Sequence, residues 1–142
     1  MCGITGWVHF KSDLRTQLPV VEKMTKTLSE RVLEAEKVWV VTHALFGHRR
    51  LTVVDSIGGK QPMTKTHQNN RYTLCYNGEL YNTEDLRKEL LRKGYTFSGH
   101  SDTEVLLTCY IEWKEQCVEY FNGIFAFAIW DEKEQKVFIA RD

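Results

Sequence analysis

Residues 123–130 constrain the fold of this chain more strongly than any other segment. Apolar side chains occupy both faces of the expected strand, with Phe125, Phe127 and Ile129 on one side and Ile124, Ala126, Ala128 and Trp130 on the other. A strand that is apolar on both faces is covered on both faces. The segment therefore predicts a sheet that is buried between two other layers of structure.

The remaining segments predict a mixture of helices and short strands. Apolar residues recur at helical spacing over residues 19–36 and 82–93, and Asn82 can cap the second of these helices. A third helix begins at residues 101–104, which have the spacing of a reciprocal capping box, and a short helical piece follows it. Strands are expected at residues 4–10, 38–46, 51–54, 72–76 and 137–140, with the turn-forming pair Asn77-Gly78 ending the strand at 72–76.

Length and charge narrow the class of protein. A chain of 142 residues is one domain in length and is long enough to bury a core. Its 19 basic and 19 acidic residues cancel and are dispersed, which predicts neither a nucleic-acid partner nor binding to an anionic membrane. The longest apolar stretch is too short to cross a bilayer, and the chain does not open with a signal-peptide pattern. We therefore expect a cytoplasmic protein.

The cysteine next to the start of the chain is the first candidate for chemistry. If Met1 is removed, Cys2 carries both a thiol and a free α-amine, whose reference pKa is about 7.7 to 8.0. Nucleophile and general base then belong to one residue, as in N-terminal nucleophiles. The structural alternative is that Cys2, beside an apolar first strand, is a small buried hydrophobic residue.

Four further residues together suggest a pocket for an amino acid. The Asn77 amide and the Gly78 N–H are able to donate two hydrogen bonds toward one point, as in an oxyanion hole, although Asn-Gly is also a common tight turn. Arg50 is suited to bind a carboxylate, and Asp102, in the first turn of a helix, is suited to bind an ammonium group. Each charge also has an ordinary structural reading, as a solvated loop charge or as an acid favoured by the helix dipole.

The sequence predicts no metal site and no cofactor. The histidines lack the helical pair spacing of zinc ligands, and the four cysteines lack paired short spacing. Gly58-Gly59 lacks the surrounding pattern of a phosphate-binding loop.

The order of these motifs resembles the glutaminase domain of glutamine-hydrolysing asparagine synthetases, a family of class II glutamine amidotransferases. The resemblance covers nearly the whole chain and rests on residues 2–6, 47–51 with Asp55, 61–63, 77–82, 101–104, 125–131 and 140–142. It implies an α+β fold of the N-terminal-nucleophile type, with two antiparallel sheets packed face to face between helical layers in a four-layer αββα sandwich.

The family also implies a reaction and a set of roles. Cys2, after removal of Met1, would attack the side-chain amide of L-glutamine to give a thioester and ammonia, and water would then release glutamate. Asn77 and the Gly78 N–H would hold the oxyanion. Arg50 would bind the substrate carboxylate and Asp102 its amine, with Glu79 lining the same pocket.

Two departures from the family pattern leave alternatives open. Residues 29–34 replace a His-Arg-Gly-Pro-Asp run, so the first helix is expected to continue near the pocket. The chain also ends at Arg141-Asp142, so we expect residues 1–142 to be a glutaminase domain that is incomplete at its C-terminus and lacks the ATP-using synthetase domain of family members. The alternatives are a non-catalytic fragment or altered copy that keeps the fold, and an N-terminal hydrolase that acts on another amide.

Overall fold

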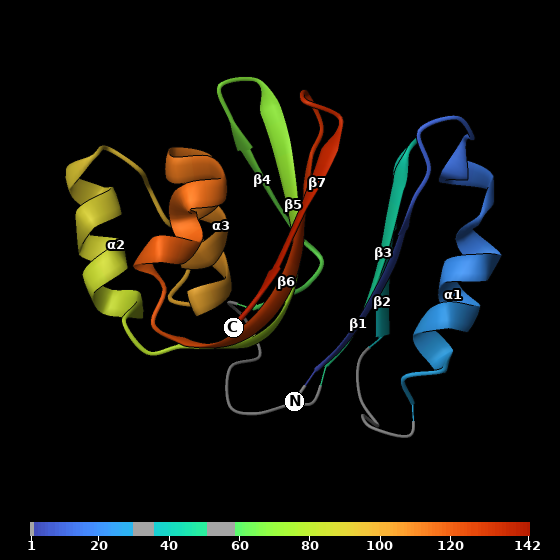
Figure 1. Ribbon diagram of the computed structural model, residues 1–142, viewed down its shortest axis with the longest axis horizontal. Coiled ribbons are helices and arrows are strands. Elements are labelled where there is room, and N and C mark those ends of the chain that lie inside the picture. The colour runs from blue at the N-terminus through green and yellow to red at the C-terminus, as the bar shows by residue number, and fades with distance from the viewer. Residues whose placement is uncertain (1, 30–35, 51–58) are drawn as a thin grey trace.

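Four layers make up the computed structural model, which describes residues 2–29, 36–50 and 59–142 (Figure 1). Helix α1 (Leu18–Lys26) covers a sheet of β1 (Gly3–Val8), β2 (Glu36–Val40) and β3 (Ala44–Arg49), ordered β1-β3-β2. A second sheet, ordered β4-β5-β6-β7, contains β4 (Met63–His67), β5 (Asn70–Leu80), β6 (Gly123–Asp131) and β7 (Lys136–Arg141). Helices α2 (Thr83–Arg92) and α3 (Asp102–Trp113) cover its outer face, and η1 (Leu14–Thr16) and η2 (Lys114–Tyr120) are short 3-10 helices. The strand pairs are antiparallel, so the predicted αββα sandwich is confirmed.

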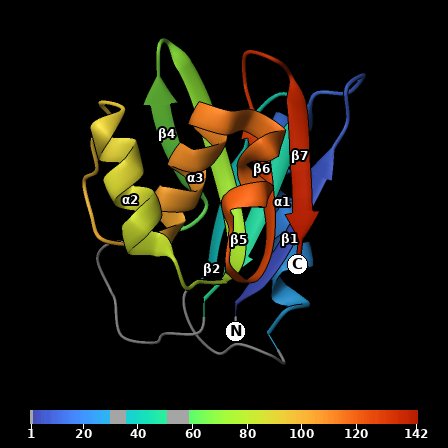
Figure 2. The ribbon, with the colours of Figure 1, turned by 60° about the vertical axis from the view of Figure 1, so that its left-hand side comes forward.

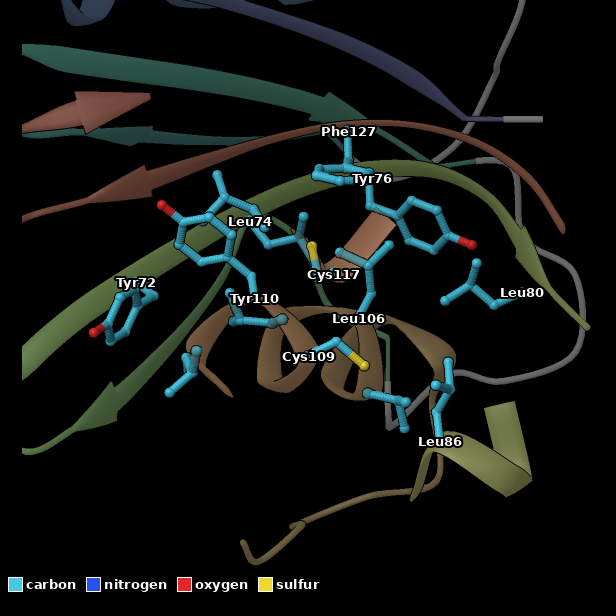
Figure 3. Close-up of a cluster of buried hydrophobic side chains, with 14 of the residues drawn as sticks. Tyr72, Leu74, Tyr76, Leu80, Leu86, Leu106, Cys109, Tyr110, Cys117 and Phe127 are labelled. Carbon is cyan, nitrogen blue, oxygen red and sulfur yellow. The ribbon is translucent and has the colours of Figure 1, made fainter. Parts of the chain in front are cut away.

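Strand β6 is covered on both faces, as its sequence predicts, except at Ile124, which is 59% exposed. Phe125, Phe127 and Ile129 belong to the main core between the second sheet and helices α2 and α3. Trp130, which is 1% exposed, belongs to a separate core between the two sheets. Figure 3 shows the main core, in which α3 side chains such as Leu106 meet Leu74 and Phe127 of the sheet.

Strand β5 is longer than the sequence predicts. It continues through Asn77 and Gly78 to Leu80 without a turn, so the predicted interruption is wrong. The glycine is needed for another reason: a Cβ on Gly78 would lie 2.2 Å from the Ile124 carbonyl oxygen of the neighbouring strand. Close approach of the two strands and a positive φ of 155° both favour glycine at this position, although no turn forms.

Helix α1 is shorter than predicted. It ends at Lys26, with Thr27–Ser29 in turns, and Glu36 already begins β2. Thr25 and Thr27 direct their hydroxyls to backbone carbonyls of the preceding turn, which weakens helix continuation. The expected helical stretch at residues 30–35 and the expected strand at 51–54 lie outside the described residues.

The predicted helix starts are right, but their side-chain contacts differ. Ser101 accepts a hydrogen bond from the Glu104 N–H at 3.3 Å, whereas the Glu104 carboxylate binds the N–H groups of Ser98 and Gly99. Asn82 precedes α2 without capping it, because its side chain binds Tyr120 and Asn122. Ser101 thus caps α3 as expected, whereas the side chains of Asn82 and Glu104 have other partners than the capping patterns predict.

The strand register positions the site. Gly3 pairs with Arg49 in the first sheet, so Cys2 and Arg50 are neighbours at the end of β1 and β3. Both views show that β1 begins, and β5 and β7 end, at the same end of the sandwich (Figures 1 and 2). Residues from both sheets therefore meet there.

Candidate active site

A cleft of about 780 Å³ opens at this end of the sandwich. Its volume is typical of small-molecule sites. All six residues that the sequence analysis selected line it: Cys2, Arg50, Asn77, Gly78, Glu79 and Asp102. The fold thus brings together residues that are separated by as much as a hundred positions in the chain.

Cys2 is held to Asn77 across the two sheets. The Cys2 backbone nitrogen donates a hydrogen bond of 2.9 Å to Asn77 Oδ1. Because the amide oxygen is used in this way, the Asn77 Nδ2 group remains as a donor. Cys2 is half-buried and lines the cleft.

Asp102 lies at the first turn of α3 and faces the cleft. Its Oδ2 atom accepts a hydrogen bond of 2.9 Å from the Tyr76 hydroxyl and a second, of 3.3 Å, from the Leu80 N–H. Two donors on one carboxylate oxygen fix the orientation of the group.

Arg50 reaches the same part of the cleft from the other sheet. A Cβ placed on Gly59 would lie 3.6 Å from Arg50 Nη2 and 3.9 Å from Thr103 Oγ1. The guanidinium is therefore close to the start of α3, where Asp102 lies. A cation and an anion face one region of the cleft, as an amino-acid backbone requires.

His48 lines the cleft but was not selected from the sequence. Its side chain is 2% exposed, and Nε2 has no hydrogen-bond partner among the described residues. Burial lowers the pKa of His48 to about 4, the positive charge of Arg50 adds to this, and a backbone hydrogen bond with Tyr76 opposes it. The ring is thus neutral near pH 7. The strands predicted at 38–46 and 51–54 leave out His48, whereas β3 runs to Arg49, so no sequence pattern indicated that this ring lies beside Arg50.

Tyr76 and Gln61 also line the cleft and were not selected. The Gln61 side-chain oxygen accepts a hydrogen bond from the Tyr76 N–H. Strand β4 begins at Met63, so this side chain serves the part of β5 that lies beyond the end of its neighbour. Sequence patterns alone do not show that a side chain accepts the backbone hydrogen bond that a neighbouring strand would otherwise accept.

A second hollow, of about 590 Å³, lies between β1 and the strands β6 and β7. Its lining is mainly apolar and includes the thiol of Cys75. Burial raises the pKa of Cys75, with a further contribution from Cys2. A thiol that stays protonated is a poor nucleophile, so the first cleft is the better candidate for chemistry.

Residues 2–29, 36–50 and 59–142 contain no group of three or more His, Cys, Asp or Glu side chains placed to hold a metal ion. Within these same ranges, no helix has the length and hydropathy needed to cross a bilayer.

Comparison with known proteins agrees with this geometry. A family model described as a glutamine amidotransferase domain matches residues 1–142. The chain is 58% identical over its whole length to asparagine synthetase [glutamine-hydrolyzing] 3 of Bacillus subtilis, covering 23% of that protein. It is 31% identical to asparagine synthetase B [glutamine-hydrolyzing] of Escherichia coli, covering 25% of it. The chain thus spans about a quarter of the length of these curated relatives.

A solved structure is similar as well. The chain superposes on the glutamine phosphoribosylpyrophosphate amidotransferase from B. subtilis with a TM-score of 0.59 and 26% identity, covering 72% of this chain and 24% of that one. The expected N-terminal-nucleophile fold and the resemblance stated from the motifs are thereby confirmed.

Proposed function

Because the chain belongs to the family of glutamine amidotransferase domains, we propose that it hydrolyses L-glutamine to glutamate and ammonia. The observation that carries this proposal is the convergence of Cys2, Arg50, Asn77, Gly78 and Asp102 on one cleft. Two sheets and a helix contribute these groups, so their convergence is a property of the tertiary fold.

The proposed reaction begins with removal of Met1. The α-amine of Cys2 then takes the proton of its own thiol, and Sγ attacks the side-chain amide carbon of glutamine. The Asn77 amide and the Gly78 N–H stabilise the negative oxygen of the tetrahedral intermediate. The protonated amine gives its proton to the departing nitrogen, and ammonia leaves a thioester on Cys2. Water attacks the thioester carbon, which releases glutamate and restores the thiol.

The Cys2–Asn77 contact supports this division of roles. The nitrogen that becomes the α-amine already donates to Asn77 Oδ1 at 2.9 Å. One side chain is then able to orient the base with its oxygen and the oxyanion with its nitrogen. Removing one oxyanion donor of this type typically lowers kcat by about a hundredfold to a thousandfold.

The charged groups of the cleft supply recognition. Arg50 binds the α-carboxylate of glutamine in this proposal, Asp102 binds the α-ammonium, and Glu79 lines the pocket beside them. A free amino acid needs both charge partners, whereas the amide of a larger substrate does not. Their placement in the same cleft favours glutamine over another amide.

The decisive experiment measures glutamate and ammonia release from glutamine, with Cys2→Ala as the matched control. We expect release by the chain from which Met1 has been removed, verified by intact mass, and none by the variant. Equal rates for the two would remove the enzymatic proposal and leave a non-catalytic copy of the fold. A chain that retains Met1 and still turns over glutamine would contradict the role of the α-amine.

The ammonia is proposed to serve amide formation by an ATP-using synthetase domain, because the relatives are named as glutamine-hydrolysing asparagine synthetases. We place this activity in the cytoplasm.

A further inference from the structure

Tyr76 lies between the main core and the cleft. Its side chain is 2% exposed, and its ring packs with the apolar residues beneath the second sheet. Figure 3 shows the ring at the edge of the cluster, with the hydroxyl on the side of Leu80 and directed away from Leu74 and Phe127. The ring is thus part of the core, and its one polar atom is directed out of it.

That polar atom has a defined partner. The hydroxyl donates a hydrogen bond of 2.9 Å to Asp102 Oδ2. Burial, and then the negative charge of Asp102, raise the pKa of Tyr76, with smaller contributions from Glu79 and Cys2. The hydroxyl therefore keeps its proton and remains a donor.

The hydrogen bonds to Asp102 are unevenly distributed. Tyr76 and the Leu80 N–H both donate to Oδ2, and no described residue donates to Oδ1. Fixing one oxygen against the protein leaves the other for a ligand in the cleft that Asp102 lines. A carboxylate held in this way is preorganised for a cation.

From this arrangement we propose that Tyr76 is a positioning residue that orients Asp102 toward the α-ammonium of the substrate. The inference rests on the proposed glutamine hydrolysis. Neighbouring residues of β5 point to opposite faces, so Tyr76 acts on the amine end while Asn77 acts on the amide end. One rigid strand then sets the spacing between the two ends of glutamine.

The test is the variant Tyr76→Phe, which deletes one oxygen and keeps the ring in the core. A hydrogen bond to a charged group is strong enough that its loss should raise the KM for glutamine by about tenfold. The kcat should stay within about twofold, because the hydroxyl does not reach the reacting amide. The matched control is Tyr72→Phe on the same strand and face, whose hydroxyl accepts from Lys114 Nζ instead; its KM should equal that of the wild type.

A second substrate separates positioning from general damage. Glutaramate is glutamine without the α-amine, so kcat/KM for glutaramate should be the same in the wild type and in Tyr76→Phe. An unchanged KM for glutamine, or an equal loss of kcat/KM on both substrates, would overturn the proposal.

Binding gives a readout that does not depend on turnover. In the Cys2→Ala background, calorimetry should show about a tenfold rise in the Kd for glutamine when Tyr76→Phe is added. If the wild type binds glutamine without hydrolysing it, the proposed function fails, and the effect on Kd still decides the role of Tyr76. An unchanged Kd, or no glutamine binding at all, would refute that role.

Discussion

At the scale of single residues, the cleft is made of polar groups whose chemistry depends on burial. His48 illustrates this most clearly, since its ring is almost fully buried and Nε2 has no partner in the described part of the chain. Charging the ring would place a cation beside Arg50 in a site where water does not reach it. The fold therefore keeps His48 neutral, which makes the stability of the protein depend on pH.

We expect the free energy of unfolding to fall as the pH is lowered from about 6.5 to about 4. The ordinary pKa of histidine, 6.5, applies in the unfolded chain, and the folded value is about 4. Between these values the unfolded state binds a proton that the folded state does not bind. The stability that this difference gives the protein above pH 6.5 is therefore lost as the pH falls. The loss amounts to about 3 kcal/mol. Urea unfolding at several pH values measures it.

The control for this prediction compares the same substitution at a buried and at an exposed histidine. His48→Gln should flatten the pH dependence between 6.5 and 4.5, whereas the same change at exposed His100 should not. The lowered pKa values of Glu104 and Glu112 start from 4.5, so their effects begin below this window. A variant at position 48 with the wild-type slope would show that another group is responsible.

At the scale of elements, strand β5 carries three of the six predicted site residues. It supplies Asn77, Gly78 and Glu79 to the cleft, and Tyr76 to the contact with α3. Continuity of this strand past residue 77 is possible because β5 and β6 approach closely at Gly78. Gly78 thus allows β5 and β6 to pair here, and this pairing fixes the position of Asn77.

Gly78→Ala should destabilise the protein and abolish turnover. The new Cβ would lie 2.2 Å from a backbone oxygen, which is not relieved by a side-chain rotation, so we expect a loss of about 3 kcal/mol or more. Gly94→Ala is the matched control, because Gly94 has a φ of 94° but no atom within 4 Å of the added Cβ. It should cost about 1–2 kcal/mol of backbone strain and leave kcat unchanged. Equal losses in the two variants, measured by chemical unfolding, would contradict the steric explanation.

At the scale of the whole molecule, the site depends on the packing of one sheet against the other. Cys2 directly precedes β1 and Arg50 directly follows β3 of the first sheet, whereas Asn77 lies on β5 of the second. The core between the sheets contains Phe46 and Trp130, both nearly fully buried. Separation of the sheets would therefore remove the nucleophile from the oxyanion donors.

Phe46→Ala should lower stability and activity together. Truncating a buried phenylalanine typically costs about 3–5 kcal/mol, and this one, 2% exposed, lies between the layers that form the cleft. Ile139→Ala, at a side chain that is 70% exposed, should change the free energy of unfolding by less than about 0.5 kcal/mol. Thermal unfolding and glutamate release on the same samples test this. Full activity in a strongly destabilised Phe46→Ala variant would show that sheet packing does not control the site.

The sequence alone determined the layered architecture and six of the residues that line the cleft. Alternating apolar residues on both faces of β6 required two covering layers, since a strand with no polar face has no place at a surface. Cys2, Arg50, Asn77, Gly78, Glu79 and Asp102 were selectable because their motifs are local. Their roles in catalysis remain predictions.

Only the tertiary structure decided how these groups are held. The extension of β5 through Asn77, the neutral ring of His48 and the hydrogen bond from Tyr76 to Asp102 all depend on a second segment that packs against the first. Periodicity reports how a segment divides its faces between core and solvent. It does not report which polar group from a distant segment lies against each face. Burial and hydrogen bonding depend on the segments that pack together in the folded protein.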